Sequence, residues 1–294
     1  MSISRSGPRL RLFLLTLLAM LAFAANSVLC RLALTQTAID AGGFTAIRLV
    51  SGAAVLWLLV MLRGGVSIRA VIGKGSWLSA CALLAYAVGF SFAYVSLPAG
   101  TGALLLFGAV QVTMVGHGLH AGERLGSGQW LGLLLACAGL VLLLLPGVSM
   151  PPLGSALLML GAGVAWGVYS LRGRGAGNPL DATAGNFVRA APIALLLAAG
   201  LHRDVAMDPA GVGYAIASGA LASGIGYAIW YSVLPSLKTT TAATVQLGVP
   251  VFAALGGTLL LAEPLTLRLI LAASAVLGGI ALVVLRRIPA SSPR

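Results

Sequence analysis

The sequence predicts an all-α integral membrane protein with ten transmembrane helices, arranged as two inverted five-helix repeats. Three observations predict it. Of the 294 residues, 59% are apolar and only 8% are charged; apolar runs of about 20 residues follow one another along the chain; and the second half repeats polar, proline and glycine positions of the first. Soluble domains carry about 25% charged residues. The composition therefore excludes a soluble enzyme, a nucleic-acid-binding domain and a disordered protein.

A helix that crosses the hydrocarbon core of a bilayer needs about 20 apolar residues. Ten such runs are present, and the connections between them are too short to hold a soluble domain. They cover residues 12–33, 43–62, 75–96, 99–119, 128–146, 153–171, 182–201, 210–234, 240–262 and 266–285. The runs are apolar on all sides, whereas the strands of an outer-membrane barrel would alternate.

The distribution of Lys and Arg predicts the orientation, because cytoplasmic loops retain these residues. One side of the predicted membrane holds 13 of them: Arg5, Arg9, Arg11, Arg63, Arg69, Lys74, Arg124, Arg172, Arg174, Lys238, Arg286, Arg287 and Arg294. The other side holds three, namely Arg31, Arg203 and Arg268. Both termini are therefore expected in the cytoplasm. The net charge of +12 reflects these loops and indicates no polyanionic partner.

An internal repeat divides the chain into residues 12–147 and 148–287, with cytoplasmic tails at 1–11 and 288–294. Asp40 and Arg48 recur 141 residues later as Asp181 and Arg189. Nine further positions, from Ala103 and Gly108 to Leu142, recur 140 residues later. Because five is odd, the second half must enter the membrane from the opposite side. Inverted repeats of this kind build many secondary transporters, with the substrate site near the midplane between the halves.

The paired motifs resemble the drug/metabolite transporter superfamily, specifically its ten-helix EamA-type members. In each half the third span is followed by Leu-Pro, and the fourth closes on a Glu, Glu123 or Glu263, before a Gly-containing fifth span. Within the family, the nearest resemblance is to the YddG-type amino-acid exporters of the bacterial inner membrane. The resemblance implies export of neutral amino acids, aromatic ones included, and related metabolites, with broad specificity, by alternating access and without ATP or another cofactor.

Aromatic and amide side chains are the candidates for substrate binding. Tyr86, Phe90 and Tyr94 recur at every fourth residue of the third span, as do Ser223, Tyr227 and Tyr231 of the eighth, so each set shares a helix face. We expect a central cavity walled by spans one, three, four, six, eight and nine. The residues expected to line it are Asn26, Tyr86, Phe90, Gln111, Trp166, Tyr227 and Gln246. The alternatives are ordinary packing and, for Tyr94 and Tyr231, an interfacial aromatic belt.

Four charged residues are candidates for gating or structural roles: Arg48, Arg189, Glu123 and Glu263. The two arginines lie close to the ends of their spans, which favours snorkelling to the interface over a carboxylate clamp or a gate latch. The two glutamates are expected to cap helix N-termini, where the helix dipole stabilises a carboxylate. His117, His120 and Glu123 share a helix face, but no further ligand lies nearby in the sequence, so no metal site is predicted.

Other functions remain as alternatives. A carrier of the same fold could move phosphorylated, nucleotide-linked or lipid-linked solutes, or drug-like organic cations, although the first three would need a basic pocket. An intramembrane enzyme is disfavoured because the Asp residues all lie at loops and no His follows His202. The expected partners are a small-molecule substrate and the lipid bilayer, with no nucleic acid, and the chain is expected to be a monomer or a weak homo-oligomer.

Overall fold

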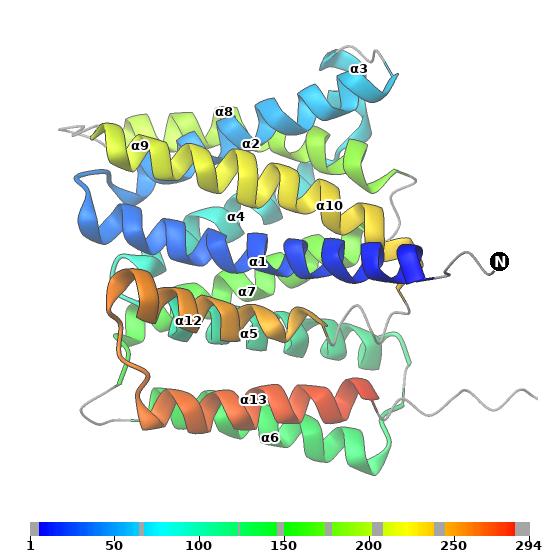
Figure 1. Cartoon of the computed structure of the whole chain (residues 1–294), viewed down its shortest axis with the longest axis vertical. Helices are drawn as coiled ribbons and strands as arrows, with labels where there is room; N and C mark the ends of the chain where they lie inside the picture. The colour runs from blue at the N-terminus through cyan, green and yellow to red at the C-terminus, as the bar shows by residue number, and fades with distance from the viewer. Residues whose placement is uncertain are drawn as a thin grey trace, which may run out of the picture.

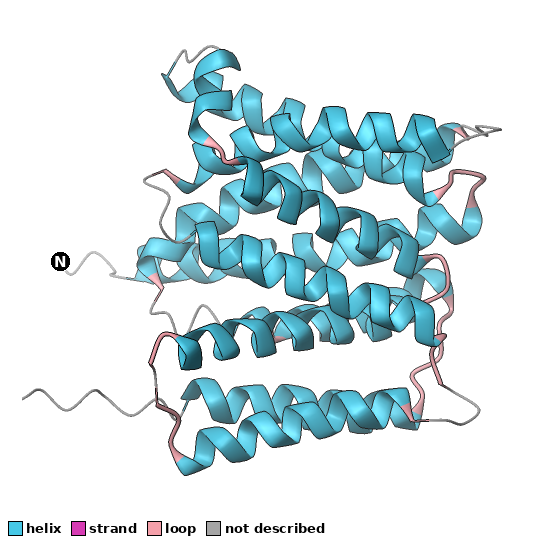
Figure 2. Ribbon diagram, turned by 180° about the vertical axis from the view of Figure 1, so that it is seen from behind, coloured by secondary structure: helices cyan, strands magenta, loops and turns pink. Residues whose placement is uncertain are grey.

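The computed structural model describes residues 6–64, 68–122, 124–145, 150–173, 178–201, 208–237 and 245–285. Helices make up the secondary structure of these ranges, and no strand occurs in them (Figure 2). Within these described ranges, eight helices are long and apolar enough to cross a membrane, and two shorter apolar helices complete the predicted ten. The prediction of an all-helical membrane fold is therefore confirmed.

The first half contains the first five predicted spans and one short helix that the hydropathy pattern did not predict. Its helices are α1 (Ser6–Gln36), α2 (Ala41–Gly64), the short α3 (Ile68–Lys74), α4 (Trp77–Tyr94), α5 (Ala99–His120) and α6 (Ser127–Leu144). Asp40 begins α2 as an N-cap, since its carboxylate accepts the backbone N–H groups of Gly42 and Gly43. Ser76 caps α4 in the same way, through the N–H of Ser79.

The second half departs from regular α-helix in two of its spans. It contains α7 (Leu153–Gly173), α8 (Pro179–Leu201), α9 (Pro209–Ile216), the π-helix η1 (Ala217–Ile225), α10 (Gly226–Val233), the 3-10 turn η2 (Leu234–Ser236), α12 (Gly248–Leu261) and α13 (Leu267–Leu285). The eighth span is thus α9, η1 and α10 in continuation. A π-helix inside an α-helix is rare and occurs frequently at functional sites.

The ninth span is interrupted close to Pro250. A proline in mid-span removes a helix hydrogen bond and clashes with the preceding turn, so the sequence predicts a kink there that the fourth span lacks. A turn at Leu247 separates the helical residues 245–246 from α12, and Pro250 is the third residue of that helix. In the first turn of a helix, the backbone N–H that proline lacks would have no partner inside the helix. The repeat mate α5 runs unbroken from Ala99 to His120. The break is therefore confined to the second half, and Pro250 lies just inside a helix start rather than in mid-helix.

The two halves pack mainly against each other rather than within themselves (Figure 1). The second span α2 packs on the seventh, α8; the fourth, α5, on the ninth, α12; and the fifth, α6, on the tenth, α13. The third span, α4, packs on the sixth, α7, and the eighth span packs on the first, α1. Exchanging the halves maps this set of pairs onto itself, as a two-fold pseudo-symmetry requires. The start of α1 and the end of α13 lie at the same end of the bundle, as an even number of crossings requires (Figure 1).

The α6–α13 pair forms a layer at one side of the bundle, and small residues let its backbones touch (Figure 1). A Cβ on Gly279 would clash with the carbonyl oxygen of Gly132, and one on Gly139 would come within 2.9 Å of that of Ala272. Close backbone approach through small residues is a common way to pack helices in lipid.

We expect Gly279→Leu to destabilise this layer strongly, because a side chain there must separate the two helices. Gly278→Leu is the matched control, since a Cβ on Gly278 meets nothing within 4 Å. Thermal unfolding of the two purified variants in detergent would show a lower Tm for Gly279→Leu alone. Equal Tm values would contradict the role of the close approach.

Candidate functional site

A small cavity lies among aromatic side chains at the interface between the halves. Its lining comes from α1, α4 and α5 of the first half and from α7, η1 and α10 of the second. The lining residues are Phe23, Asn26, Ser27, Tyr86, Phe90, Leu106, Phe107, Trp166, Ala222 and Tyr227. Its volume is about 20 Å³, which is room for about one water molecule. In this conformation the side chains that line the cavity therefore pack against one another and leave no room for an organic solute.

Ring contacts explain why the cavity is so small. Trp166 packs against Tyr86 at 4.8 Å between ring centroids and is stacked on Tyr169 and Tyr227 at 5.4 and 5.3 Å. On α4, Tyr86 contacts Phe90 at 5.4 Å, and Phe90 contacts Tyr94 at 4.7 Å. The predicted shared face of α4 is confirmed. The Tyr86–Trp166 contact joins the two halves, and these rings together supply a large apolar contact area.

Five of the seven predicted lining residues meet at this cavity: Asn26, Tyr86, Phe90, Trp166 and Tyr227. Gln111 is buried on α5 but does not line it. Gln246 precedes the turn at Leu247 and does not line it either, and the part of the ninth span that the structure describes contributes no lining residue. The placement of these two amides at the cavity was therefore wrong: Gln111 lies further along α5 than its lining residues Leu106 and Phe107, and Gln246 lies before the break.

A polar network borders the cavity and connects four elements. Arg48 of α2 donates from Nη2 to Tyr86 Oη at 2.9 Å and from Nε to Ser223 Oγ of η1 at 3.5 Å. Asn26 of α1 donates to the same Tyr86 Oη at 3.2 Å, and its amide oxygen accepts the hydroxyl of Ser218. In a π-helix the backbone bonds join residues five apart. The π geometry thus turns Ser218 and Ser223, which are five apart, toward α1 and α2.

Arg48 is buried, with 1% of its surface exposed, so the expectation that it snorkels to the interface was wrong. Its guanidinium carbon lies 5.1 Å from the ring centroid of Tyr86 and 4.8 Å from that of Phe90. Gly219 of η1 permits this packing, because any Cβ there would clash with the Arg48 carbonyl and with Ser51. Among the described residues, Arg48 forms no ion pair, and its Nη1 has no hydrogen-bond partner.

The repeat mate Arg189 takes a different position. It is half-buried, donates to the carbonyl of Gly185 at 3.4 Å, and packs on the ring of Trp77 at 5.6 Å, near the start of α4. The side chain follows its helix back toward the N-terminus, and its Nε is buried without a hydrogen-bond partner among the described residues. Arg48 and Arg189 thus occupy matching positions in the repeat but have different surroundings in the folded chain.

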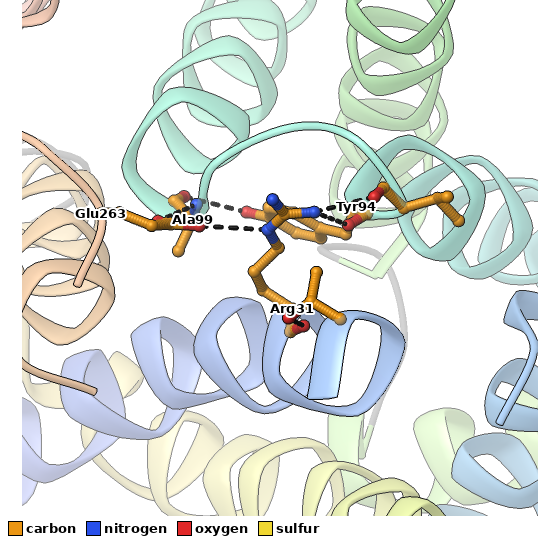
Figure 3. A network of polar contacts seen from close by, with 6 residues as sticks. Arg31, Tyr94, Ala99 and Glu263 are labelled. Carbon is orange, nitrogen blue, oxygen red and sulfur yellow. Dashed lines mark hydrogen bonds and ion pairs between the residues drawn. The ribbon is translucent and has the colours of Figure 1, made fainter. Parts of the chain in front are cut away.

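A network of polar contacts around the Arg31–Glu263 ion pair forms a second candidate site, which Figure 3 shows from close by. It lies at the opposite end of the bundle from α3 (Figure 1). Arg31 Nε contacts Glu263 Oε1 at 3.0 Å, while Arg31 Nη1 donates to the carbonyls of Tyr94 and Val95 at 3.0 and 2.8 Å. Glu263 Oε2 accepts the backbone N–H of Ala99 at 2.7 Å. The network joins the end of α1 to the α4–α5 turn and to the α12–α13 connection.

Two expectations are revised by this network. Glu263 does contact a helix N-terminus, as a capping carboxylate would, but the helix is α5 of the other half rather than its own successor α13. Tyr94 is buried and donates to the carbonyl of Ala99, so it is not part of an interfacial belt. Glu123, the repeat mate of Glu263, lies outside the described residues, and with it the His117–His120–Glu123 set. Within the described part of the chain, no cluster of three His, Cys, Asp or Glu could hold a metal ion.

A larger hollow of about 300 Å³ opens at the α3 end of the bundle. It is lined by Lys74, Gly75, Ser76, Ser79, Arg172, Gly173, Ala182 and Asn186. Asn186 accepts the backbone N–H of Ser76, and Arg172 donates to Ser79. The central cavity therefore lies between an end fastened by an ion pair and an end with an open polar hollow.

The comparisons with known proteins agree with this architecture. The model of the EamA-like transporter family matches residues 153–285. The chain is 59% identical over 281 residues to an uncharacterized protein of Pseudomonas aeruginosa, covering 96% of this chain and 97% of the relative. It is 28% identical over 206 residues to an uncharacterized transporter of Archaeoglobus fulgidus, covering 69% and 74%. A solved crystal structure shares the fold with a TM-score of 0.67 at 20% identity, over 97% of this chain and all of the other.

The fold and the cavity define a multi-pass membrane transporter of small solutes. The chain belongs to the EamA-like transporter family, within the drug/metabolite transporter superfamily. The resemblance stated from the paired Glu and Leu-Pro motifs is thereby confirmed at the level of the family.

Proposed function

We propose that the protein is a secondary exporter of neutral amino acids and related small metabolites in the bacterial inner membrane, with broad specificity. The observation that carries this proposal is the aromatic cavity between the halves, bordered by the hydroxyl of Tyr86 and the amide of Asn26. Aromatic walls supply contact area for side chains of varied shape, and a few polar groups orient the substrate. A phosphate ester would need several converging basic groups, whereas one guanidinium borders this cavity. The same guanidinium would repel an organic cation.

The mechanism that this arrangement supports is alternating access about the cavity. Substrate enters from the polar hollow at the α3 end, which the charge distribution assigns to the cytoplasm. The aromatic rings separate to admit it, and the cavity then becomes continuous with the opposite end once the Arg31–Glu263 network opens. The roles assigned to Asn26, Tyr86, Phe90, Trp166 and Tyr227 as substrate contacts belong to this proposal.

Transport by the purified protein in proteoliposomes is the direct test. Counterflow of labelled phenylalanine, leucine and alanine should exceed that of protein-free vesicles, with and without an imposed pH gradient. A parallel set containing a phosphate ester, a nucleotide sugar and a quaternary ammonium compound covers the alternative carriers. Transport of only this second set would refute the proposed substrate class.

The proposed orientation places both termini in the cytoplasm. A reporter fused after Arg287 should therefore be active in its cytoplasmic form, and one fused in the loop around Arg203 in its periplasmic form. A periplasmic reading after Arg287 would contradict the orientation.

A further inference from the structure

Arg48 is the charged group that borders the cavity and could select one chemical group of the substrate. Its guanidinium is buried between α2, α4 and η1, and among the described residues no carboxylate neutralises it. A charge buried at membrane depth is costly and normally pairs with an opposite charge. The structure supplies hydroxyl groups and ring faces instead, and it leaves Nη1 without a partner.

The hydrogen-bond directions around Arg48 also favour an anion. Tyr86 Oη accepts from both Arg48 Nη2 and Asn26 Nδ2, which occupies its two lone pairs. The hydroxyl hydrogen of Tyr86 is therefore directed away from both of them. Ser223 Oγ likewise accepts from Arg48, and its own hydrogen remains available. The amide oxygen of Asn26, which also lines the cavity, already accepts the hydroxyl of Ser218. The polar groups around Arg48 thus offer unused hydrogen-bond donors and few free hydrogen-bond acceptors.

The closed cavity explains how this cluster meets a ligand. A volume of about 20 Å³ is far below the hundreds of cubic ångströms typical of small-molecule sites, so substrate entry must move the rings. Tyr86 and Phe90 both line the cavity and both cover the Arg48 guanidinium. The ring movement that makes room for a substrate is therefore the same movement that uncovers Arg48.

We infer that Arg48, with the hydroxyl of Tyr86, binds a carboxylate of the transported solute, so that the protein selects its substrates by that group and tolerates variation elsewhere. This inference rests on the proposed function and narrows its substrate class to carboxylate-bearing solutes. A guanidinium presents parallel N–H groups that match a carboxylate, and such charge-assisted bonds are strong where water is excluded. The carboxylate supplies the counter-charge that the described residues lack.

The test uses four solutes that share one ring and differ in their polar groups: phenylalanine, phenylalanine amide, phenylethylamine and 3-phenylpropionate. Binding is measured as thermal stabilisation of the full chain in detergent, and transport as counterflow in proteoliposomes. The wild type should bind phenylalanine and 3-phenylpropionate at least tenfold more tightly than the two solutes without a carboxylate. In Arg48→Gln this preference should disappear, while the amide and the amine keep their affinities within about twofold.

Arg189→Gln is the matched control, because Arg189 is the repeat mate of Arg48 and packs on Trp77, away from the cavity lining. It should keep the carboxylate preference. Arg48→Met provides a second variant if Arg48→Gln folds poorly, since apolar replacement of a buried charge is often well tolerated. Tyr86→Phe should weaken binding of both carboxylates severalfold while leaving the ring contacts in place.

The outcomes separate this inference from the proposed function. Equal binding of phenylalanine and its amide by the wild type would overturn the inference, even if amino acids are transported. A loss in Arg48→Gln that is the same for all four solutes would also overturn it, because it would show that Arg48 only holds Tyr86 in place. Selective carboxylate binding without amino-acid transport would uphold the inference and refute the proposed function.

Discussion

Reversing the charge of Arg31 should nearly abolish transport, with a fall of about a hundredfold. Arg31→Glu removes the contact with Glu263 and both bonds to the α4–α5 turn, and it places a second carboxylate near the first. Each lost bond to a charged group is worth about 2 kcal/mol, and the repulsion adds to this loss. The end of the bundle at Arg31 would then remain open, so the carrier could not return to the state described here.

Two measurements separate an opened end from a misfolded protein. In a variant without native cysteines, Ser27→Cys places a thiol in the cavity one helical turn from Arg31, where Ser27 is 1% exposed. A membrane-impermeant maleimide added from outside should label this thiol much faster when Arg31→Glu is also present, because the cavity then stays open to that side. The double reversal, Arg31→Glu with Glu263→Arg, should restore part of the transport.

Arg268→Glu is the control for charge reversal at the same end. Arg268 donates to the carbonyl of Leu145, which belongs to the α6–α13 layer rather than to the walls of the cavity. Its reversal should leave transport within about threefold. If Arg31→Glu transports normally and does not speed the labelling of Ser27→Cys, the ion pair does not control access to the cavity.

The spans and the repeat could be predicted because they depend on local properties of the sequence. Hydropathy over about 20 residues identifies a membrane helix whatever its neighbours are. The four-residue spacing of Tyr86, Phe90 and Tyr94 likewise fixes a shared face, and the structure brings these rings into contact. Five of the seven proposed lining residues were identified because deep aromatic and amide side chains on facing spans tend to converge between the repeats.

The burial of the Arg48 side chain could not be predicted, because it depends on a neighbouring element far away in the sequence. The first half alone suggests a side chain close to a helix end. In the structure, η1 crosses α2 so tightly at Gly219 that Arg48 is enclosed. No sequence pattern indicates the π-helix, so the position of Ser218 was missed. Ser223 was placed on one face with Tyr227, but its bond to Arg48 was not predicted. Phe23, Ser27, Leu106, Phe107 and Ala222 were missed as lining residues because apolar and small side chains are common on every span.

The Arg31–Glu263 pair was within reach of the sequence, although it spans 232 residues. Arg31 is one of only three basic residues on its side of the predicted membrane, and Glu263 is the only acidic residue at the end of the ninth span. An isolated charge at the end of a span seeks a partner at the same depth. Because Glu263 was expected to cap the helix that follows it, Glu263 was not recognised as the partner of Arg31.

Trp166→Ala should change the substrate range more than any other single replacement at the cavity. Its ring is in contact with Tyr86, Tyr169 and Tyr227, so its loss leaves a space between both halves that no neighbour fills directly. Large solutes should lose their flat contact surface, and transport of phenylalanine and tryptophan should fall by at least tenfold. Alanine, which needs little contact area, should change by less than about threefold.

The matched control is Trp130→Ala on α6, because Trp130 is 47% exposed on the outer layer and does not line the cavity. Both variants should insert and purify, because Trp166 is only partly buried and its loss should cost less than the roughly 3–5 kcal/mol typical of a fully buried tryptophan. Transport rates for solutes of increasing size, divided by the amount of protein in the vesicles, give the comparison. If Trp166→Ala and Tyr227→Ala both transport every solute at wild-type rates, the aromatic cluster serves packing alone and the substrate passes elsewhere, because no solute could cross this cavity without displacing those two rings.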